Sequence, residues 1–162
     1  MKIAILSDSH DHTDNVKKAI SRIKKLGVDA LIHLGDHCAP FIIKEFSQLE
    51  MPQYHIQGNN VGDAFVAGQL FERFSHMSFE GVYCEHEFAG VSFAFTHYPD
   101  IALRVAQSGV FDVVCYGHTH VYKEENVDDC LLLNPGSLMP DDSLGQFVVY
   151  DTEDDSVSVH TL

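Results

Sequence analysis

Side chains that commonly bind metal ions follow short apolar stretches of this sequence. The chain opens with an apolar run from Ile3 to Leu6, and Asp8 and His10 come directly after it. Such a run is typical of a strand that is buried on both faces. Residues two apart on an extended chain point the same way, so Asp8 and His10 present a carboxylate and an imidazole to one space. Further candidates follow later apolar runs: Asp36, Asn59, His97, His118 and His120.

These seven candidates follow five segments that we expect to be strands. The segments are residues 3–6, 29–34, 53–57, 91–96 and 112–116. Taken singly the motifs are weak, because a Gly-Asp or Gly-Asn pair is more often a turn, and a histidine after a strand is more often structural than a ligand. In a sheet with parallel central strands, however, the carboxyl ends of the strands converge on one edge, where ligands bind. The shared position therefore predicts that the seven side chains meet in one site.

The mixture of imidazole, carboxylate and amide donors restricts the cation that such a site would hold. It suits Mn, Fe, Zn or Ni better than calcium, which prefers oxygen ligands only, or magnesium, which keeps its waters. Seven ligands are too many for one four-coordinate ion. We therefore predict two divalent transition-metal ions, with Mn the first choice, that share a bridging carboxylate. Two carboxylates leave this pair with net positive charge, which attracts phosphate and lowers the pKa of a bridging water.

The first half of the chain predicts alternating strands and helices that would position these ligands. We expect helices at residues 13–26, 40–49, 64–74 and 99–107. In the first of them, Thr13 is the expected N-terminal cap and Gly27 ends the helix. A strand, a helix and a second strand of these lengths indicate a βαβ unit with a parallel strand pair.

The second half of the chain is richer in strands. Residues 82–88 and 91–96 flank a turn at Ala89 and Gly90 and predict a β-hairpin. Further short strands are expected at residues 121–125, 130–133, 146–151 and 156–161. The fold class that we predict is α/β, a four-layer α/β/β/α sandwich of two mixed sheets flanked by helices. The sequence contains no repeat or linker, so we expect a single domain over residues 1–162.

Composition and charge narrow the classes of protein to consider. The chain has 162 residues, of which 45% are hydrophobic, and this composition predicts a globular protein without a membrane span. Its formal charge is −14, and half of the ten basic residues lie between Lys17 and Lys25, which argues against binding long nucleic acids. The four cysteines form no C-x-x-C motif, which favours reduced thiols and a cytoplasmic protein: Cys38, Cys84, Cys115 and Cys130.

The order of the ligand motifs resembles that of a known enzyme family, the calcineurin-like metallophosphoesterases. The motifs are D-x-H, G-D, G-N, a single histidine and G-H-x-H, and their spacing is most similar to the small single-domain bacterial and archaeal phosphodiesterase branch, as is the stretch 134–137. The resemblance implies the same four-layer sandwich and a dinuclear metal site. It implies that Asp36 bridges the two ions, with Asp8, His10 and His120 completing one site and Asn59, His97 and His118 the other.

One residue departs from the family pattern. Many members carry a histidine directly after G-N that contacts the phosphate and assists the leaving group, and Asn60 occupies that position here. The proton donor to the leaving group is therefore not identified, although Asn60 can donate a hydrogen bond to a phosphoryl oxygen. Asp36 and Asn60 are the predicted catalytic residues. His37 is expected behind the ligands or exposed, and a structural role is predicted for the remaining histidines: His12, His33, His55, His76, His86 and His160.

The predicted function is a metal-dependent phosphoesterase that acts on small phosphodiesters, with a bridging hydroxide attacking phosphorus. A diester carries less charge than a monoester and suits an acidic protein better, so a phosphomonoesterase is an alternative. A non-catalytic scaffold of the same fold is a second alternative, against which the complete set of seven ligands argues. A homo-oligomer is possible through the apolar stretches 41–43 and 138–140, although the first is interpreted as core.

Overall fold

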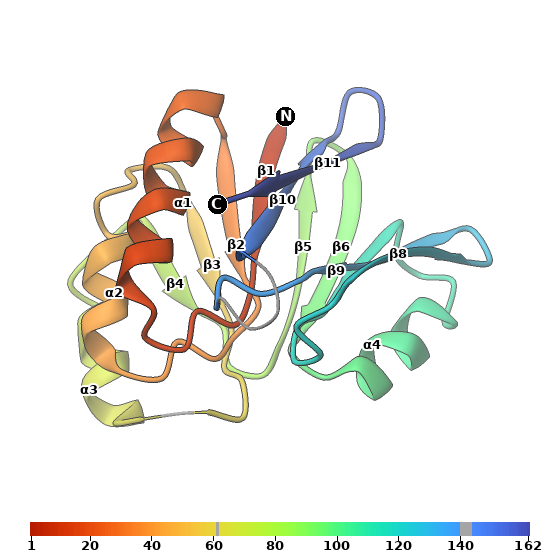
Figure 1. Ribbon diagram of the computed structural model, residues 1–162. Helices are drawn as coiled ribbons and strands as arrows, with labels where there is room; N and C mark the ends of the chain where they lie inside the picture. Colours follow the sequence, from red (N-terminus) through yellow and green to blue (C-terminus); the bar gives the residue numbers. More distant parts are fainter. Residues whose placement is uncertain (61, 140–143) are drawn as a thin grey trace.

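The computed structural model describes residues 1–60, 62–139 and 144–162, in which two sheets pack face to face with helices on their outer sides (Figure 1). The helices are α1 (Thr13–Leu26), α2 (Pro40–Phe46), α3 (Ala64–Phe71) and α4 (Pro99–Ala106). The six-stranded sheet has the order β11-β10-β1-β2-β3-β4, and the five-stranded sheet has the order β5-β6-β7-β9-β8.

The strands of the six-stranded sheet come from both ends of the chain: β1 (Lys2–Leu6), β2 (Ala30–His33), β3 (Gln53–His55), β4 (Met77–Phe79), β10 (Gln146–Asp151) and β11 (Ser156–Thr161). Those of the other sheet lie in between: β5 (Tyr83–Phe88), β6 (Val91–Thr96), β7 (Val113–Cys115), β8 (Tyr122–Val127) and β9 (Cys130–Pro135). β1, β2 and β3 are parallel, and so are β6 and β7. The strands that precede the predicted ligands are therefore the parallel ones.

Three apolar clusters fill the spaces between the four layers. Leu6, Ile20 and Phe46 belong to the cluster between α1–α3 and the six-stranded sheet. The cluster between the two sheets contains residues such as Ile5 and Phe95, and that between the second sheet and α4 is smaller: Ala94, Ala102, Ala106, Val114, Tyr116, Cys130 and Leu132. β1 is buried on both faces because it lies between two of these clusters. The predicted four-layer α/β/β/α sandwich is confirmed.

Three details of the predicted elements were wrong. Strand β4 was not predicted, and both α2 and α3 end earlier than expected, α2 at Phe46 and α3 at Phe71. The N-cap of α1 is His12 and not Thr13, because the ring Nδ1 of His12 accepts a hydrogen bond from the N–H of Asn15 at 3.3 Å. Gly27 does end this helix, in the left-handed conformation with φ of 64°.

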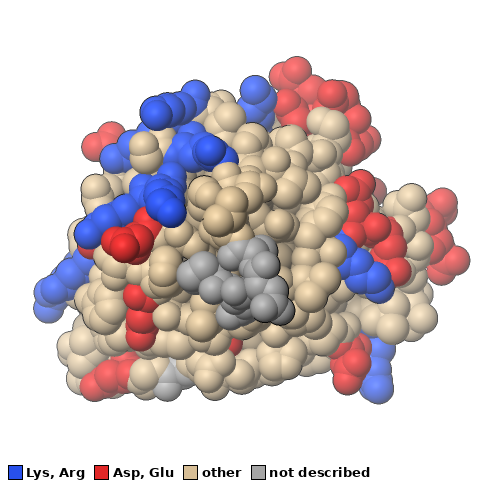
Figure 2. All heavy atoms as spheres, in the orientation of Figure 1, with Lys and Arg blue, Asp and Glu red and all other residues tan. Residues whose placement is uncertain are grey.

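The charges of the protein are separated on its surface. Figure 2 shows lysines and arginines gathered over α1, while acidic side chains dominate the other side of this view. Within the described residues, no helix is long and apolar enough to cross a membrane. All four cysteines are free. Of the two apolar stretches, Ile42 and Ile43 are buried as core whereas Phe41 is exposed; Leu138 is also buried, and Pro140 lies outside the described residues.

Candidate metal centre

The structure brings the predicted ligands together where five parallel strands end. Asp8 and His10 follow β1, Asp36 follows β2, Asn59 follows β3, His97 follows β6, and His118 and His120 follow β7. The Oδ2 atom of Asp36 lies 3.5 Å from Nε2 of His10 and 3.6 Å from Nε2 of His97. The Oδ1 atom of Asp8 lies 3.6 Å from Nε2 of His10 and 3.3 Å from Nε2 of His120.

Two overlapping groups of these side chains have the spacing of metal ligands. One consists of Asp8, His10 and His120, and the other of Asp8, Asp36 and His97. Within each group, one ligand atom from each residue lies within 4.8 Å of the others. Asn59 joins the second group, because its Oδ1 lies 2.9 Å from Nε2 of His97 and 2.8 Å from Nδ1 of His118. The carboxylates of Asp8 and Asp36 lie between His10 and His120 on one side and His97 on the other. A carboxylate that is shared by two ions needs such a position.

The hydrogen bonds of His97 identify the kind of ligand that fits this site. Its Nδ1 lies 2.7 Å from the carbonyl oxygen of Leu34, which can only accept, so the ring proton is on Nδ1. Nε2 of His97 faces the Oδ1 of Asn59 at 2.9 Å, and the carboxylate oxygens of Asp8 and Asp36 lie nearby at 4.0 Å and 3.6 Å. Three oxygen acceptors that converge on one imidazole nitrogen suit a cation, which that nitrogen binds through its lone pair.

The carboxylate of Asp8 is buried and retains an open coordination position. Its Oδ2 accepts a hydrogen bond from the N–H of His118 at 3.0 Å, whereas its buried Oδ1 has no hydrogen-bond partner within the described residues. Burial alone would raise the pKa of Asp8, but contacts with His10 and Ser7 and the nearby rings of His97 and His120 outweigh it and lower that pKa. An ionised carboxylate oxygen buried without a donor fits a metal ion.

Several residues in the ligand loops have a left-handed backbone conformation that orients their side chains toward the site. Positive φ values occur at several of the ligands: Asp8, His10, Asp36, His118 and His120. Such left-handed conformations of residues other than glycine cost free energy and concentrate at functional sites. Gly58 allows one loop to approach another, because an added Cβ there would overlap Oδ1 of Asp36. The local sequence is therefore adapted to the close approach of the two loops.

Two residues of the stretch 134–137, for which the sequence analysis noted the family resemblance without assigning a role, brace these loops. The side chain of Asn134 donates to the carbonyl of Gly117 at 2.9 Å and to Oγ1 of Thr119 at 3.0 Å. The hydroxyl of Ser137 donates to the carbonyl of Asp8 at 3.0 Å. The stretch 134–137 thus connects the Asp8 loop to the loop of His118 and His120, and its N-P-G-S sequence was the available signal.

Asn60 contacts Asp36 through two groups. Its N–H donates to Oδ1 of Asp36 and its side-chain amide donates to Oδ2, both at 2.7 Å. The side-chain amide of Asn60, which we predicted to contact substrate, therefore holds the carboxylate of Asp36 in this structure. Asn60 is also exposed to solvent, so it lies at the open side of the site.

Most histidines outside the site make structural contacts. His86 lies 3.0 Å from the hydroxyl of Tyr54, and the ring of His160 stacks on Phe147. His37 is not exposed, because its ring is buried against that of His33 at a centroid distance of 3.8 Å, and it lines a small cavity together with Asp36 and Asn60. His55 lies beside the same pair, which makes a second histidine cluster behind the ligand loops.

Comparison with known proteins agrees with the fold and identifies the family. The profile of the calcineurin-like phosphoesterase superfamily domain matches residues 1–155, so the chain belongs to this family. Among curated proteins it is similar to phosphodiesterase MJ0936 of Methanocaldococcus jannaschii, with 36% identity over 138 residues that cover 84% of this chain and 83% of the relative. The similarity extends to the structure of a protein described as a novel archaeal phosphodiesterase, with a TM-score of 0.93, 32% identity and full coverage of both chains.

The family assignment decides between the enzyme and the non-catalytic alternative. The chain is a phosphoesterase and therefore a hydrolase, and its relatives are named as phosphodiesterase and metallophosphoesterase. The Vps29 protein of Chaetomium thermophilum is also similar in structure, with a TM-score of 0.70 over all of this chain and 93% of that one. Its sequence identity is 16%, so this likeness shows the fold alone.

Proposed function

We propose that this chain, as one domain, hydrolyses small phosphodiesters with two divalent transition-metal ions, of which manganese is the first choice and Ni, Fe and Zn are alternatives. The observation that carries the proposal is the cluster of acceptors around His97. Oδ1 of Asn59 and Oδ2 of Asp36 converge on Nε2 of His97, and Asn60 holds that Asp36 oxygen from one side. Oδ1 of Asp8, which is buried and has no hydrogen-bond partner within the described residues, completes this set.

Each proposed ligand has a defined task. Asp36 lies between His10 and His97, which supports a bridging role. Asp8 stays ionised at neutral pH because its pKa is lowered, so it supplies negative charge to the cations. The carbonyl of Leu34 fixes the tautomer of His97 and so orients its Nε2 toward the site. The remaining proposed ligands are His10, Asn59, His118 and His120.

Two bound cations would supply positive charge for the phosphoryl oxygens. They would also lower the pKa of the attacking water, which gives the bridging hydroxide that we predicted. The chain itself holds the reacting groups in place. Phosphoryl transfer depends mainly on positioning and on stabilisation of charge, and Asn60 lies at the exposed side of the site where a phosphoryl oxygen would arrive. Its amide has a second N–H besides the one that holds Asp36, so it can donate to both partners.

The preference for a small diester follows from charge and from the relatives. The protein carries a formal charge of −14, and half of its ten basic residues lie in α1, where Figure 2 shows them gathered, which argues against the binding of a long polyanion. A diester brings one negative charge fewer than a monoester to this acidic surface. Two similar proteins are described as phosphodiesterases, which supports the same preference.

The experiment compares an aryl phosphodiester with its monoester, each with Mn, Ni, Mg and Zn added to metal-free protein. We expect faster hydrolysis of the diester, with the highest activity in one of the transition metals. Faster hydrolysis of the monoester with every metal would replace the proposal with a phosphomonoesterase. Activity in the presence of a strong chelator would contradict the metal dependence.

A further inference from the structure

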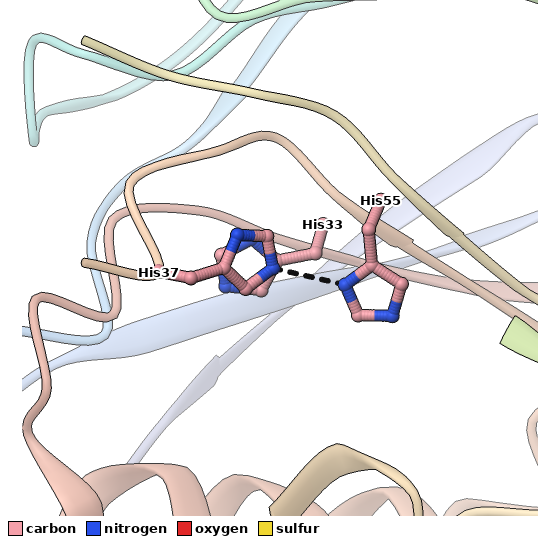
Figure 3. Close-up of side chains that lie close together, drawn as sticks. All are labelled: His33, His37 and His55. Carbon is pink, nitrogen blue, oxygen red and sulfur yellow. Dashed lines mark hydrogen bonds between the residues drawn. The ribbon is translucent and has the colours of Figure 1, made fainter. Parts of the chain in front are cut away.

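A second cluster of metal-binding side chains lies behind the ligand loops. His33, His37 and His55 each offer one ring nitrogen, and the three nitrogens lie within 4.8 Å of one another. All three side chains are buried, with 0% exposure at His33 and His55 and 9% at His37. Figure 3 shows His37 and His55 pointing toward each other, with His33 beside His37.

The sheet itself produces this arrangement. β2 and β3 are parallel neighbours, and their register pairs His33 with His55. His37 returns over them from the loop after β2, and its ring stacks on that of His33 with an interplanar angle of 25°. The three rings are enclosed by Phe46 and Phe71, with centroid distances of 5.1 Å from His33 to Phe46 and 5.0 Å from His55 to Phe71.

One member of the cluster is already oriented as a ligand. The side-chain amide of Gln53 donates to the carbonyls of Phe46 at 3.0 Å and Leu49 at 2.6 Å, so its Oε1 is an acceptor. This Oε1 lies 3.0 Å from Nε2 of His55, which therefore carries the ring proton and leaves a lone pair on Nδ1. A histidine whose other N–H is held by a fixed acceptor is the usual arrangement around bound metals.

A second member has a buried polar atom without a partner. Nε2 of His33 makes no hydrogen bond within the described residues, while Nδ1 accepts a long bond of 3.3 Å from the N–H of Gly35. A buried nitrogen without a partner costs about 1–3 kcal/mol. A cation at Nε2 would provide the missing partner, and the ring proton would then move to Nδ1 and open the Gly35 contact.

From this geometry we propose that His33, His37 and His55 form an additional cation site, separate from the Asp8–Asp36 centre, that takes Zn²⁺ with three nitrogen ligands and one water. Two nitrogens that bind tetrahedral zinc at about 2.0–2.1 Å lie about 3.3 Å apart. Nε2 of His37 is 2.9 Å from Nδ1 of His55, so that pair separates by a few tenths of an ångström on binding. A cavity of about 30 Å³ adjoins the cluster at His37 and has room for the water; it is also lined by Phe71 and Phe79 and, on the side of the ligand loops, by Asp36 and Asn60.

The protonation state of the cluster suits zinc. Burial lowers the pKa values of His33 and His55 well below their usual range, and repulsion from neighbouring histidines acts in the same direction. These two rings are therefore neutral at pH 7, the form that binds metal. The carboxylates of Asp36 and Asp8 are the negative charges that act on His37, and they offset part of the charge of a buried dication.

The first test measures zinc bound by the full chain after removal of metal and dialysis against Zn²⁺. We expect His55→Gln to bind one zinc ion per chain fewer than the wild type, because glutamine lacks the imidazole lone pair. His86→Gln changes a histidine outside the cluster and is expected to match the wild type. If the cluster is only a hydrogen-bonded network, His55→Gln and the wild type bind the same amount of zinc. Equal zinc content in the two proteins therefore overturns the proposal.

The second test needs no variant and separates this site from the proposed hydrolytic centre. Wild-type crystals are soaked in Zn²⁺, and anomalous diffraction is recorded at the zinc absorption edge. We expect a peak among the rings of His33, His37 and His55. Peaks confined to the Asp8–Asp36 centre overturn this inference and leave the proposed function intact, whereas a peak among the three rings alone supports this inference and counts against the dinuclear centre.

Discussion

Both carboxylate oxygens of Asp36 accept hydrogen bonds from Asn60, one from its N–H and one from its side-chain amide, each at 2.7 Å. Asp36 is also the carboxylate that lies between His10 and His97. The residue that occupies the position of a family histidine is thus tied to the proposed bridging ligand. Asn60 can act by positioning Asp36, by contacting substrate, or by both.

Replacement of Asn60 by alanine separates these two roles. The variant loses the amide contact to Oδ2 of Asp36 but keeps the backbone N–H, and loss of such a supporting contact costs about 10- to 100-fold in metal affinity or activity. If Asn60 only positions Asp36, a high metal concentration restores kcat; if it also contacts the phosphoryl group, kcat stays low at saturating metal. Asn126→Ala, at an exposed position of β8, is the matched control and should behave as the wild type.

Alanine at Gly58 is expected to damage the site. The new Cβ would overlap Oδ1 of Asp36 and would lie 2.6 Å from the backbone nitrogen of Asp36, so the carboxylate and the loop that carries it must both move. We expect hydrolysis to fall by at least about 100-fold, the upper end of the effect of disturbing a ligand's surroundings. Gly68→Ala is the control, because a Cβ there meets nothing within 4 Å and alanine favours the helix by about 0.5–1 kcal/mol. Normal activity of Gly58→Ala would show that the loop tolerates the displacement.

The histidine cluster predicts acid sensitivity of the metal-free protein. Burial, with repulsion from neighbouring histidines, holds the pKa values of His33 and His55 well below their usual 6.5 in the folded chain. The unfolded chain therefore binds more protons as pH falls below about 6.5, so the free energy of unfolding falls with it. Urea unfolding with a chelator at pH 7.5 and pH 5.5 measures this loss, and His55→Gln should reduce it. A loss that is unchanged in His55→Gln would assign the effect to other groups.

Bound metal is expected to stabilise the fold. A ligand that binds only the folded chain stabilises it by about 2.7 kcal/mol at a hundred times its Kd. Thermal unfolding with and without Mn²⁺ should show a higher Tm with metal in the wild type. The shift should be much smaller in Asp8→Asn, whose Oδ1 lies near both His10 and His120. The same shift in both proteins would mean that manganese binds elsewhere.

Much of the fold was predictable because the sequence carries local signals for it. The apolar stripe of α1 and Gly27 gave its bounds, and the turn at Ala89 and Gly90 gave the hairpin of β5 and β6. β4 has three residues, as β3 and β7 do, but it precedes none of the candidate ligand motifs that drew attention to those two strands. The cap of α1 was wrong because His12 offers a ring nitrogen where Thr13 offered the more usual hydroxyl.

The candidate ligands were predictable because each follows a strand that is parallel to at least one neighbouring strand. To predict that these ligands converge, only the strand topology was needed, and the geometry of the side chains was not. The contact between Asn60 and Asp36 depends on how two loops approach each other at Gly58, which no local pattern encodes. The pairing of His33 with His55 depends on the register of β2 and β3, and both had been interpreted as separate structural histidines.

The central claim is that Asp36 organises a metal centre that hydrolyses phosphodiesters, and the direct measurement is bound Mn²⁺ together with diester hydrolysis in wild type and Asp36→Asn. The substitution keeps the size of the side chain and removes the charge that lies between His10 and His97. The account predicts that Asp36→Asn folds, binds less manganese and shows no detectable turnover. Full activity of Asp36→Asn with its manganese content unchanged would contradict the account.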